Sequence, residues 1–164
     1  MEIRAAAAGD WEHSKNVRLR ALAEAPNAFC SSLDRELAFD DQAWRDRLQR
    51  GRTFLAWNGG ITVGTATGTV DPHDEGGREL VAMWVDPNER RTGVAVALID
   101  AVVEWARAER APAIALWVAE DNVSALRLYE KCGFTLTGER ELMRPGVDQV
   151  RMRKPLTQSA DTNS

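Results

Sequence analysis

The pattern of apolar and polar positions divides the chain into short strands and helices that alternate along most of its length. Apolar runs bounded by turn residues predict strands, and apolar residues spaced three and four apart predict helices. The expected strands span about residues 2–6, 53–57, 61–70, 78–85, 114–118, 134–137 and 147–154. The expected helices span about residues 10–25, 41–50, 94–108 and 122–132. This alternation indicates an α/β or α+β fold with a mixed sheet.

Local sequence features add detail to several of these elements. Asn58-Gly59-Gly60 tolerates the positive φ angles of a tight turn and predicts a hairpin between the second and third strands. Helix 94–108 is apolar on nearly all faces and is expected to be largely buried. Residues 26–39 mix apolar and polar positions without periodicity, which is typical of a mobile loop over a pocket.

The composition bounds the size and class of the protein. A chain of 164 residues with 44% hydrophobic content fits one globular domain, which we place at residues 1–156. Residues 157–164 are polar and predict a disordered tail. The net charge of −4 argues against general binding to nucleic acid or to an anionic membrane, and it slightly favours a cationic partner.

The location and metal content follow from absences in the sequence. The first residues lack the basic segment followed by a long apolar core that is typical of a signal peptide. No apolar run reaches the roughly 18 residues that span a bilayer, so we expect a cytoplasmic protein. Cys30 and Cys132 lack metal-ligand spacing, and only two histidines accompany them. We therefore expect reduced thiols and no metal site.

A basic, glycine-containing turn directly precedes helix 94–108. It reads Arg90-Arg91-Thr92-Gly93, followed by the small Ala95 in the first helical turn. The first amides of a helix have no intrahelical acceptor, and a glycine lets a ligand approach them closely. These features are typical of a phosphate site, although two solvated arginines before a core helix are an alternative interpretation.

A second segment, 122–134, places polar side chains along one side of the next helix. Asn122, Ala125 and Tyr129 are spaced three and four apart, and Tyr129 is the only tyrosine of the chain. A tyrosine here is either a proton donor or a half-buried aromatic whose hydroxyl reaches solvent.

Together the two segments resemble the GNAT superfamily of N-acetyltransferases. Arg90-x-x-Gly93-x-Ala95 is similar to the family's pyrophosphate motif, and the helix and turn at 122–134 are similar to its later motif. The resemblance implies a single GNAT-like domain with a mostly antiparallel twisted sheet of about six or seven strands and about four helices. It also implies acetyl-coenzyme A as acyl donor, with cofactor contacts from Met83, Trp84, Val85, Arg90, Arg91, Thr92, Gly93, Val94, Ala95, Val96, Asn122, Ser124 and Tyr129.

By the same resemblance, Tyr129 protonates the departing thiolate while acetyl passes directly to a primary amine of a small molecule or peptide. At neutral pH an amine must first lose a proton, and Glu79 is our candidate base, with another carboxylate or a water chain as alternatives. Candidate acceptor contacts are Phe29, Ser32 and Glu36. A homodimer, transfer of a larger acyl group and a non-catalytic coenzyme A sensor stay open.

Overall fold

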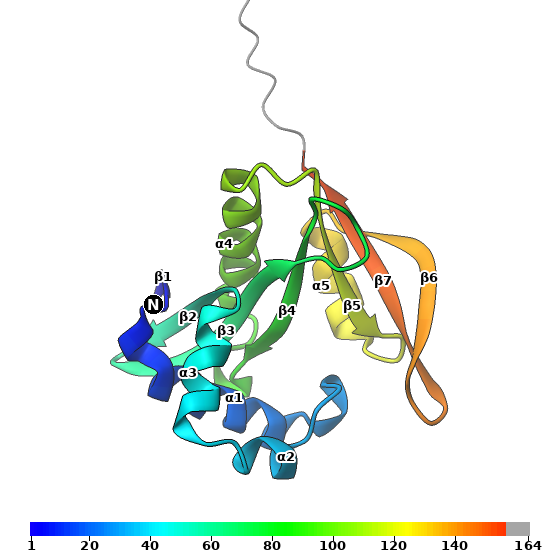
Figure 1. The fold of residues 1–164 in the computed structure, drawn as a ribbon. Helices are drawn as coiled ribbons and strands as arrows, with labels where there is room; N and C mark the ends of the chain where they lie inside the picture. The colour runs from blue at the N-terminus through cyan, green and yellow to red at the C-terminus, as the bar shows by residue number, and fades with distance from the viewer. Residues whose placement is uncertain (157–164) are drawn as a thin grey trace, which may run out of the picture.

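A seven-stranded mixed sheet forms the centre of the computed structural model, which describes residues 1–156. The strand order is β1-β2-β3-β4-β5-β7-β6, and every neighbouring pair is antiparallel except β4 and β5 (Figure 1). The strands are β1 (Glu2–Ala5), β2 (Arg52–Asn58), β3 (Ile61–Val70), β4 (Arg78–Val85), β5 (Ala113–Ala119), β6 (Thr135–Arg144) and β7 (Val147–Pro155).

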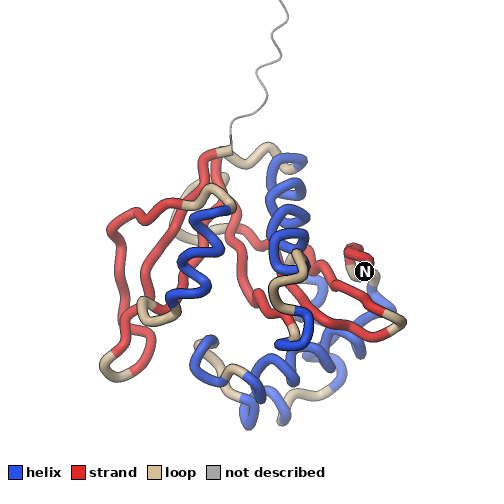
Figure 2. The backbone as a smooth tube through the Cα atoms, turned by 180° about the vertical axis from the view of Figure 1, so that it is seen from behind, coloured by secondary structure: helices blue, strands red, loops and turns tan. Residues whose placement is uncertain are grey.

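Helices cover both faces of this sheet. The helices are α1 (Trp11–Glu24), α2 (Leu33–Leu37), α3 (Asp41–Gln49), α4 (Val94–Ala108) and α5 (Val123–Lys131), with short 3₁₀ turns η1 (Ala8–Asp10), η2 (Pro26–Ala28) and η3 (Pro87–Glu89). Helices α4 and α5 lie on one face, and α1 to α3 lie on the other (Figures 1 and 2). The helices on each face can therefore supply one wall of a site at the sheet.

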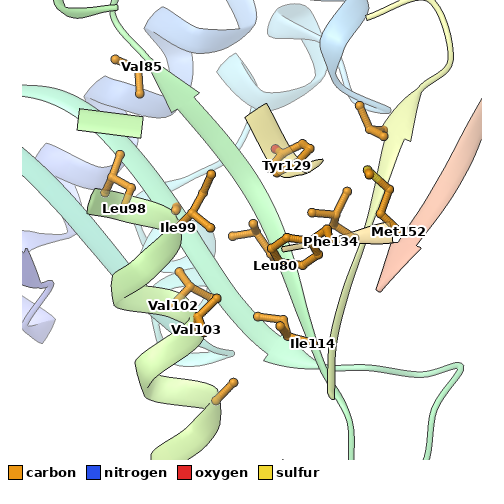
Figure 3. Packing of buried hydrophobic residues seen from close by; sticks show 14 of the residues in the cluster. Leu80, Val85, Leu98, Ile99, Val102, Val103, Ile114, Tyr129, Phe134 and Met152 are labelled. Carbon is orange, nitrogen blue, oxygen red and sulfur yellow. The ribbon is translucent and has the colours of Figure 1, made fainter. Parts of the chain in front are cut away.

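The main core lies between α4, α5 and the sheet. Leu98, Ile99 and Val102 of α4 are fully buried against strand residues and against Phe134, which follows α5 (Figure 3). Gly68 of β3 permits the closest approach, because a Cβ there would lie 2.4 Å from the ring of Trp105. Burying an aliphatic side chain of this size contributes about 1.5–3 kcal/mol, so α4 is anchored by packing along its whole length.

Strands β4 and β5 separate soon after they begin to pair. Their parallel register contains only Arg78 with Ile114 and Glu79 with Ala115. Further along β4, Ala82 has a φ of 54°, and the register with β3 shifts at this point, which is the signature of a β-bulge. The last part of β4 therefore presents unpaired backbone groups toward β5.

The structure confirms the fold class, the sheet and the hairpin through Asn58 to Gly60, and it adds detail where the sequence pattern was weak. Segment 26–39 carries η2 and α2 instead of being an irregular loop, so residues 1–156 contain five α-helices. Strand β6 extends to Arg144, well beyond the predicted end at residue 137.

The expected tail at 157–164 lies outside the described residues. Within residues 1–156, no helix has the length and apolar character of a membrane span.

Candidate active site

Two cavities meet where β4 and β5 diverge. One, of about 980 Å³, opens toward α4 and α5, and we call it the donor cavity. The other, of about 620 Å³, lies under α1 to α3, and we call it the acceptor cavity. Both are lined by the bulge residue Ala82, by Trp117 of β5 and by Phe29. A molecule in one cavity can therefore touch a molecule in the other across the bulge.

The amino end of α4 forms a concave set of free amides at the donor cavity. Arg91 has a φ of 66° and Gly93 a φ of 90°, and no side chain of the described part of the chain caps the helix. The first helical bond runs from the amide of Ala97 to the carbonyl of Gly93, so within residues 1–156 the amides of 91–96 lack acceptors. Successive free amides in such a turn, at the positive end of a helix dipole, bind phosphate.

Basic side chains add positive charge to the same cavity. Arg90, Arg91, Arg127 and Lys131 line the donor cavity, whereas Glu24 is its only acidic lining residue among residues 1–156. The Arg90 guanidinium donates to the Val85 carbonyl at 3.1 Å and to Glu24 at 2.9 Å. Arg90 is thus held across the end of β4. This contact fixes the free amides of residues 91–96, which we call the phosphate cradle, relative to the bulge.

The strand residues predicted to contact a cofactor lie on the open edge of β4. Met83, Trp84 and Val85 all line the donor cavity. The Trp84 side chain is buried on the opposite side against α1, where its indole nitrogen donates to Glu24 at 2.9 Å. Trp84 can therefore offer only backbone groups to a ligand, as expected for the pantetheine arm of coenzyme A.

Tyr129 lies between the diverging strands. Its ring faces Phe134 (Figure 3), and the two aromatic rings make an edge-to-face contact with centroids 5.9 Å apart. Its hydroxyl has no hydrogen-bond partner within residues 1–156, and the residue lines the donor cavity. Burial, with a smaller effect of Cys132, raises the pKa of Tyr129 far above its usual value, so the hydroxyl keeps its proton.

Asn122 and Ser124 bring α5 to the same cavity. The side-chain oxygen Oδ1 of Asn122 accepts from the backbone amide of Ala125 at 3.2 Å, which caps the helix. Its amide nitrogen keeps two donors for a ligand. The structure thus places all the predicted cofactor residues along this cavity except Thr92 and Val94, which contribute only backbone amides to the cradle.

Glu79 lies in the acceptor cavity, at the last paired position of β4 before the strands diverge. Burial and the neighbouring charge of Asp71 raise the pKa of Glu79 above its usual range, while Arg151 opposes the shift. The carboxylate has no ion pair within the described residues. A partly buried, unpaired carboxylate is suited to accept a proton from an ammonium group.

The three predicted acceptor contacts have different positions. Phe29 lines both cavities, but Ser32 and Glu36 line neither. The Ser32 hydroxyl caps α2 by accepting from the Arg35 amide at 3.2 Å. Glu36 is fully buried and binds Arg18 and Arg47 instead of facing the cavity. Neither residue is therefore placed to touch an acceptor, but Glu36 orients two arginines that line the acceptor cavity.

Sequence reasoning missed the cavity residues that are brought together by distant segments. Trp117 reads as an ordinary core residue of an apolar strand, yet it forms the wall shared by both cavities. Arg18 and Arg47 belong to different helices, and only the fold places them at one site. No local pattern could have indicated their roles, because each depends on chain segments far away in sequence.

The geometry agrees with what comparison with known proteins finds. Residues 19–134 match the model of the acetyltransferase (GNAT) family. The chain belongs to the GNAT family. It is 30% identical to the L-amino acid N-acetyltransferase AaaT of Escherichia coli K12, over 93% of this chain and 96% of that protein.

Two further GNAT comparisons differ in coverage. The mycothiol acetyltransferase of Geodermatophilus obscurus is 35% identical over half of this chain, which covers only 28% of that protein's length. The structure of yncA, described as a putative acetyltransferase from Salmonella typhimurium with its cofactor acetyl-CoA, superposes with a TM-score of 0.78. At 18% identity, with 100% of this chain and 98% of that one covered, this likeness shows the fold.

Proposed function

We propose that the protein transfers an acetyl group from acetyl-coenzyme A directly to a primary amine. The observation that carries the proposal is the junction of the two cavities at the β4 bulge, with Tyr129 on the donor side and Glu79 on the acceptor side. This arrangement lets both substrates bind at once, so no covalent enzyme intermediate is needed.

The donor cavity offers a fit to each part of acetyl-coenzyme A. The free amides of 91–96 and the surrounding basic side chains suit its phosphates, and the open edge of β4 suits its amide-containing arm. When bound, acetyl-coenzyme A supplies an activated thioester. The yncA structure, which contains acetyl-CoA, supports placing the same ligand here.

The chain's own residues supply acid and base at opposite sides of the junction. Glu79 accepts the proton that an ammonium must lose before it can attack, either directly or through one water. An unpaired amide near Met83 stabilises the negative charge that develops on the carbonyl oxygen. Tyr129 donates its proton to the departing thiolate, because its buried hydroxyl has no competing hydrogen-bond partner within residues 1–156.

Coenzyme A release across a panel of amines tests the proposal, with mass spectrometry of the products. L-amino acids head the panel because the relative AaaT is an L-amino acid N-acetyltransferase, and amino-terminal peptides and simple amines complete it. We expect a mass gain of one acetyl group on at least one amine. Thiol release without any acetylated amine would contradict the proposal.

A further inference from the structure

The charge in the acceptor cavity is opposite to that of the whole protein. The net charge of the chain is −4, yet four arginines line this cavity, Arg18, Arg35, Arg47 and Arg50, and we call them the arginine wall. The acidic lining residues within the described part of the chain are Glu79 and Glu141. The site therefore favours an anion more than the overall composition indicates.

Positive and negative groups are separated across the cavity. The arginine wall comes from α1, α2 and the end of α3, which lie over one face of the sheet (Figure 1). Glu79 and Glu141 come from strands β4 and β6. A molecule with charges of both signs would match this separation when its ammonium group faces the strands.

The buried Glu36 holds two of the arginines in place without using all their donors. Arg18 binds Glu36 through Nε at 2.9 Å and Nη2 at 3.0 Å, which leaves Nη1 without a hydrogen-bond partner among residues 1–156. Arg47 binds the same carboxylate through Nη1 alone. Arg18 also stacks on Phe29, with 4.7 Å between the guanidinium carbon and the ring centroid. Both guanidinium groups are thus oriented and still able to donate.

The remaining two arginines have no counterion among the described residues. Arg35 and Arg50 are exposed at the cavity, and neither side chain has an ion pair or hydrogen bond with any of residues 1–156. Two arginines balanced by one carboxylate, together with two unbalanced arginines, leave a local excess of positive charge. Guanidinium groups bind carboxylates and phosphates with paired hydrogen bonds.

We infer that the acetyl acceptor carries an anionic group, a carboxylate or a phosphate, which the arginine wall binds while the amine faces Glu79. This inference rests on the proposed acetyl transfer and narrows its acceptor class. It excludes purely cationic acceptors such as polyamines, which the arginines would repel. Arg18, Arg35, Arg47 and Arg50 are specificity residues in this account, because they bind the acceptor away from the reacting atoms.

A matched set of acceptors tests the inference without requiring the natural acceptor. Each member of an amino-acid series is compared with its carboxamide and with the amine that lacks the carboxyl group, and a phosphorylated amine provides the second anion. We expect kcat/KM for an anionic acceptor to exceed that for its neutral partner at least about 10-fold, in line with one or two charge-assisted hydrogen bonds. Comparison of carboxylate with phosphate then identifies the anion.

Variants of the unpaired arginines give the second readout. The double variant Arg35→Gln, Arg50→Gln should raise KM for the anionic acceptor about 10-fold, with little change in kcat and little change for the neutral amide. Arg45→Gln is the matched control, because Arg45 is an exposed arginine of α3 that stacks on Trp11 and does not line the cavity. The control should behave as wild type with every acceptor.

The outcomes separate this inference from the proposed function. If the neutral amides and simple amines are acetylated as well as the acids, acetyl transfer stands and the anionic acceptor is refuted. An equal loss for acid and amide in the double variant would also refute it. Absence of acetylation on every amine would instead overturn the proposed function, and with it the acceptor class that rests on it.

Discussion

At the residue scale, the proposed mechanism depends on two side chains whose environments fit them for opposite proton transfers. Tyr129 is buried among apolar residues, and this burial keeps its hydroxyl protonated. Glu79 is only partly buried, and burial together with Asp71 makes its carboxylate a stronger base than an exposed glutamate. The raised pKa therefore keeps the proton on Tyr129, whereas it makes Glu79 accept a proton more readily.

Replacing Tyr129 by Phe should lower kcat about 100-fold and leave the affinity for coenzyme A nearly unchanged. The ring contact with Phe134 survives the substitution, and the lost hydroxyl has no partner in residues 1–156, so thermal stability should hold. Steady-state kinetics, calorimetric binding and a melting curve measure the three effects. An unchanged kcat would remove Tyr129 from the mechanism.

Glu79 should impose an acidic limb on the pH profile of kcat/KM. A base acts only when deprotonated, so the rate falls as the pH drops through the pKa of Glu79, which burial raises above its usual value of 4.5. Glu79→Gln should lower the rate and abolish this limb. Glu75→Gln is a control, since Glu75 is an exposed acid in the loop that precedes β4. A limb that persists unchanged in Glu79→Gln would assign the base elsewhere.

At the element scale, short segments with strong local signals could be predicted, and features made by two segments could not. The hairpin follows from Asn58 to Gly60, and the buried α4 follows from its apolar sequence. The divergence of β4 from β5 follows from the bulge at Ala82, a residue that has no intrinsic preference for a positive φ. Its conformation coincides with a register shift between β4 and β3, and the local sequence does not encode this long-range pairing.

The amino end of α4 gives a prediction at this scale. Gly93 has a φ of 90° and nothing within 4 Å of an added Cβ, so Gly93→Glu should fold with a loss of about 1–2 kcal/mol while placing a carboxylate at the phosphate cradle. Coenzyme A affinity should fall at least about 100-fold. Gly59→Glu is the matched control, since Gly59 has a φ of 59° and equally open surroundings in the β2–β3 turn.

Calorimetric titration and urea unfolding of the two glycine variants distinguish strain from ligand exclusion. Both variants should lose similar stability, and only the Gly93 variant should lose affinity for coenzyme A. Equal affinity in Gly93→Glu and wild type would show that the cradle does not bind the phosphates.

At the scale of the whole molecule, the helical layer α1 to α3 is fastened around a buried carboxylate. Glu36 joins Arg18 of α1 to Arg47 of α3, and the acceptor cavity lies between this layer and the sheet. The sequence predicts Glu36 as an acceptor contact. This prediction is wrong because the ion pairs of Glu36 depend on two arginines 18 and 11 residues away, which no local pattern indicates. The same cluster that shapes the cavity also contributes to stability.

Glu36 should make the protein sensitive to acid. Burial opposes ionisation, but hydrogen bonds from Arg18, Arg47 and Ser31 lower the pKa of Glu36 to about 2. A lowered pKa stabilises the fold above the usual value of 4.5, and this stabilisation disappears as the pH falls from about 4.5 to 2. Glu36→Gln should cost about 3 kcal/mol at pH 7 and flatten that dependence, measured by urea unfolding.

An exposed acid of α1 provides the control for this series, since Glu12→Gln should change the free energy of unfolding little at any pH. A Glu36→Gln variant as stable as wild type at pH 7 would show that the two arginines do not depend on this carboxylate.

The central claim is that donor and acceptor occupy adjoining cavities together and react directly across the β4 bulge. Initial rates of coenzyme A release, measured while acetyl-coenzyme A and an accepted amine are both varied, test this claim most directly. Direct transfer in a ternary complex predicts intersecting lines in the double-reciprocal plot. Parallel lines, with acetyl retained on the protein when the amine is omitted, would contradict the account.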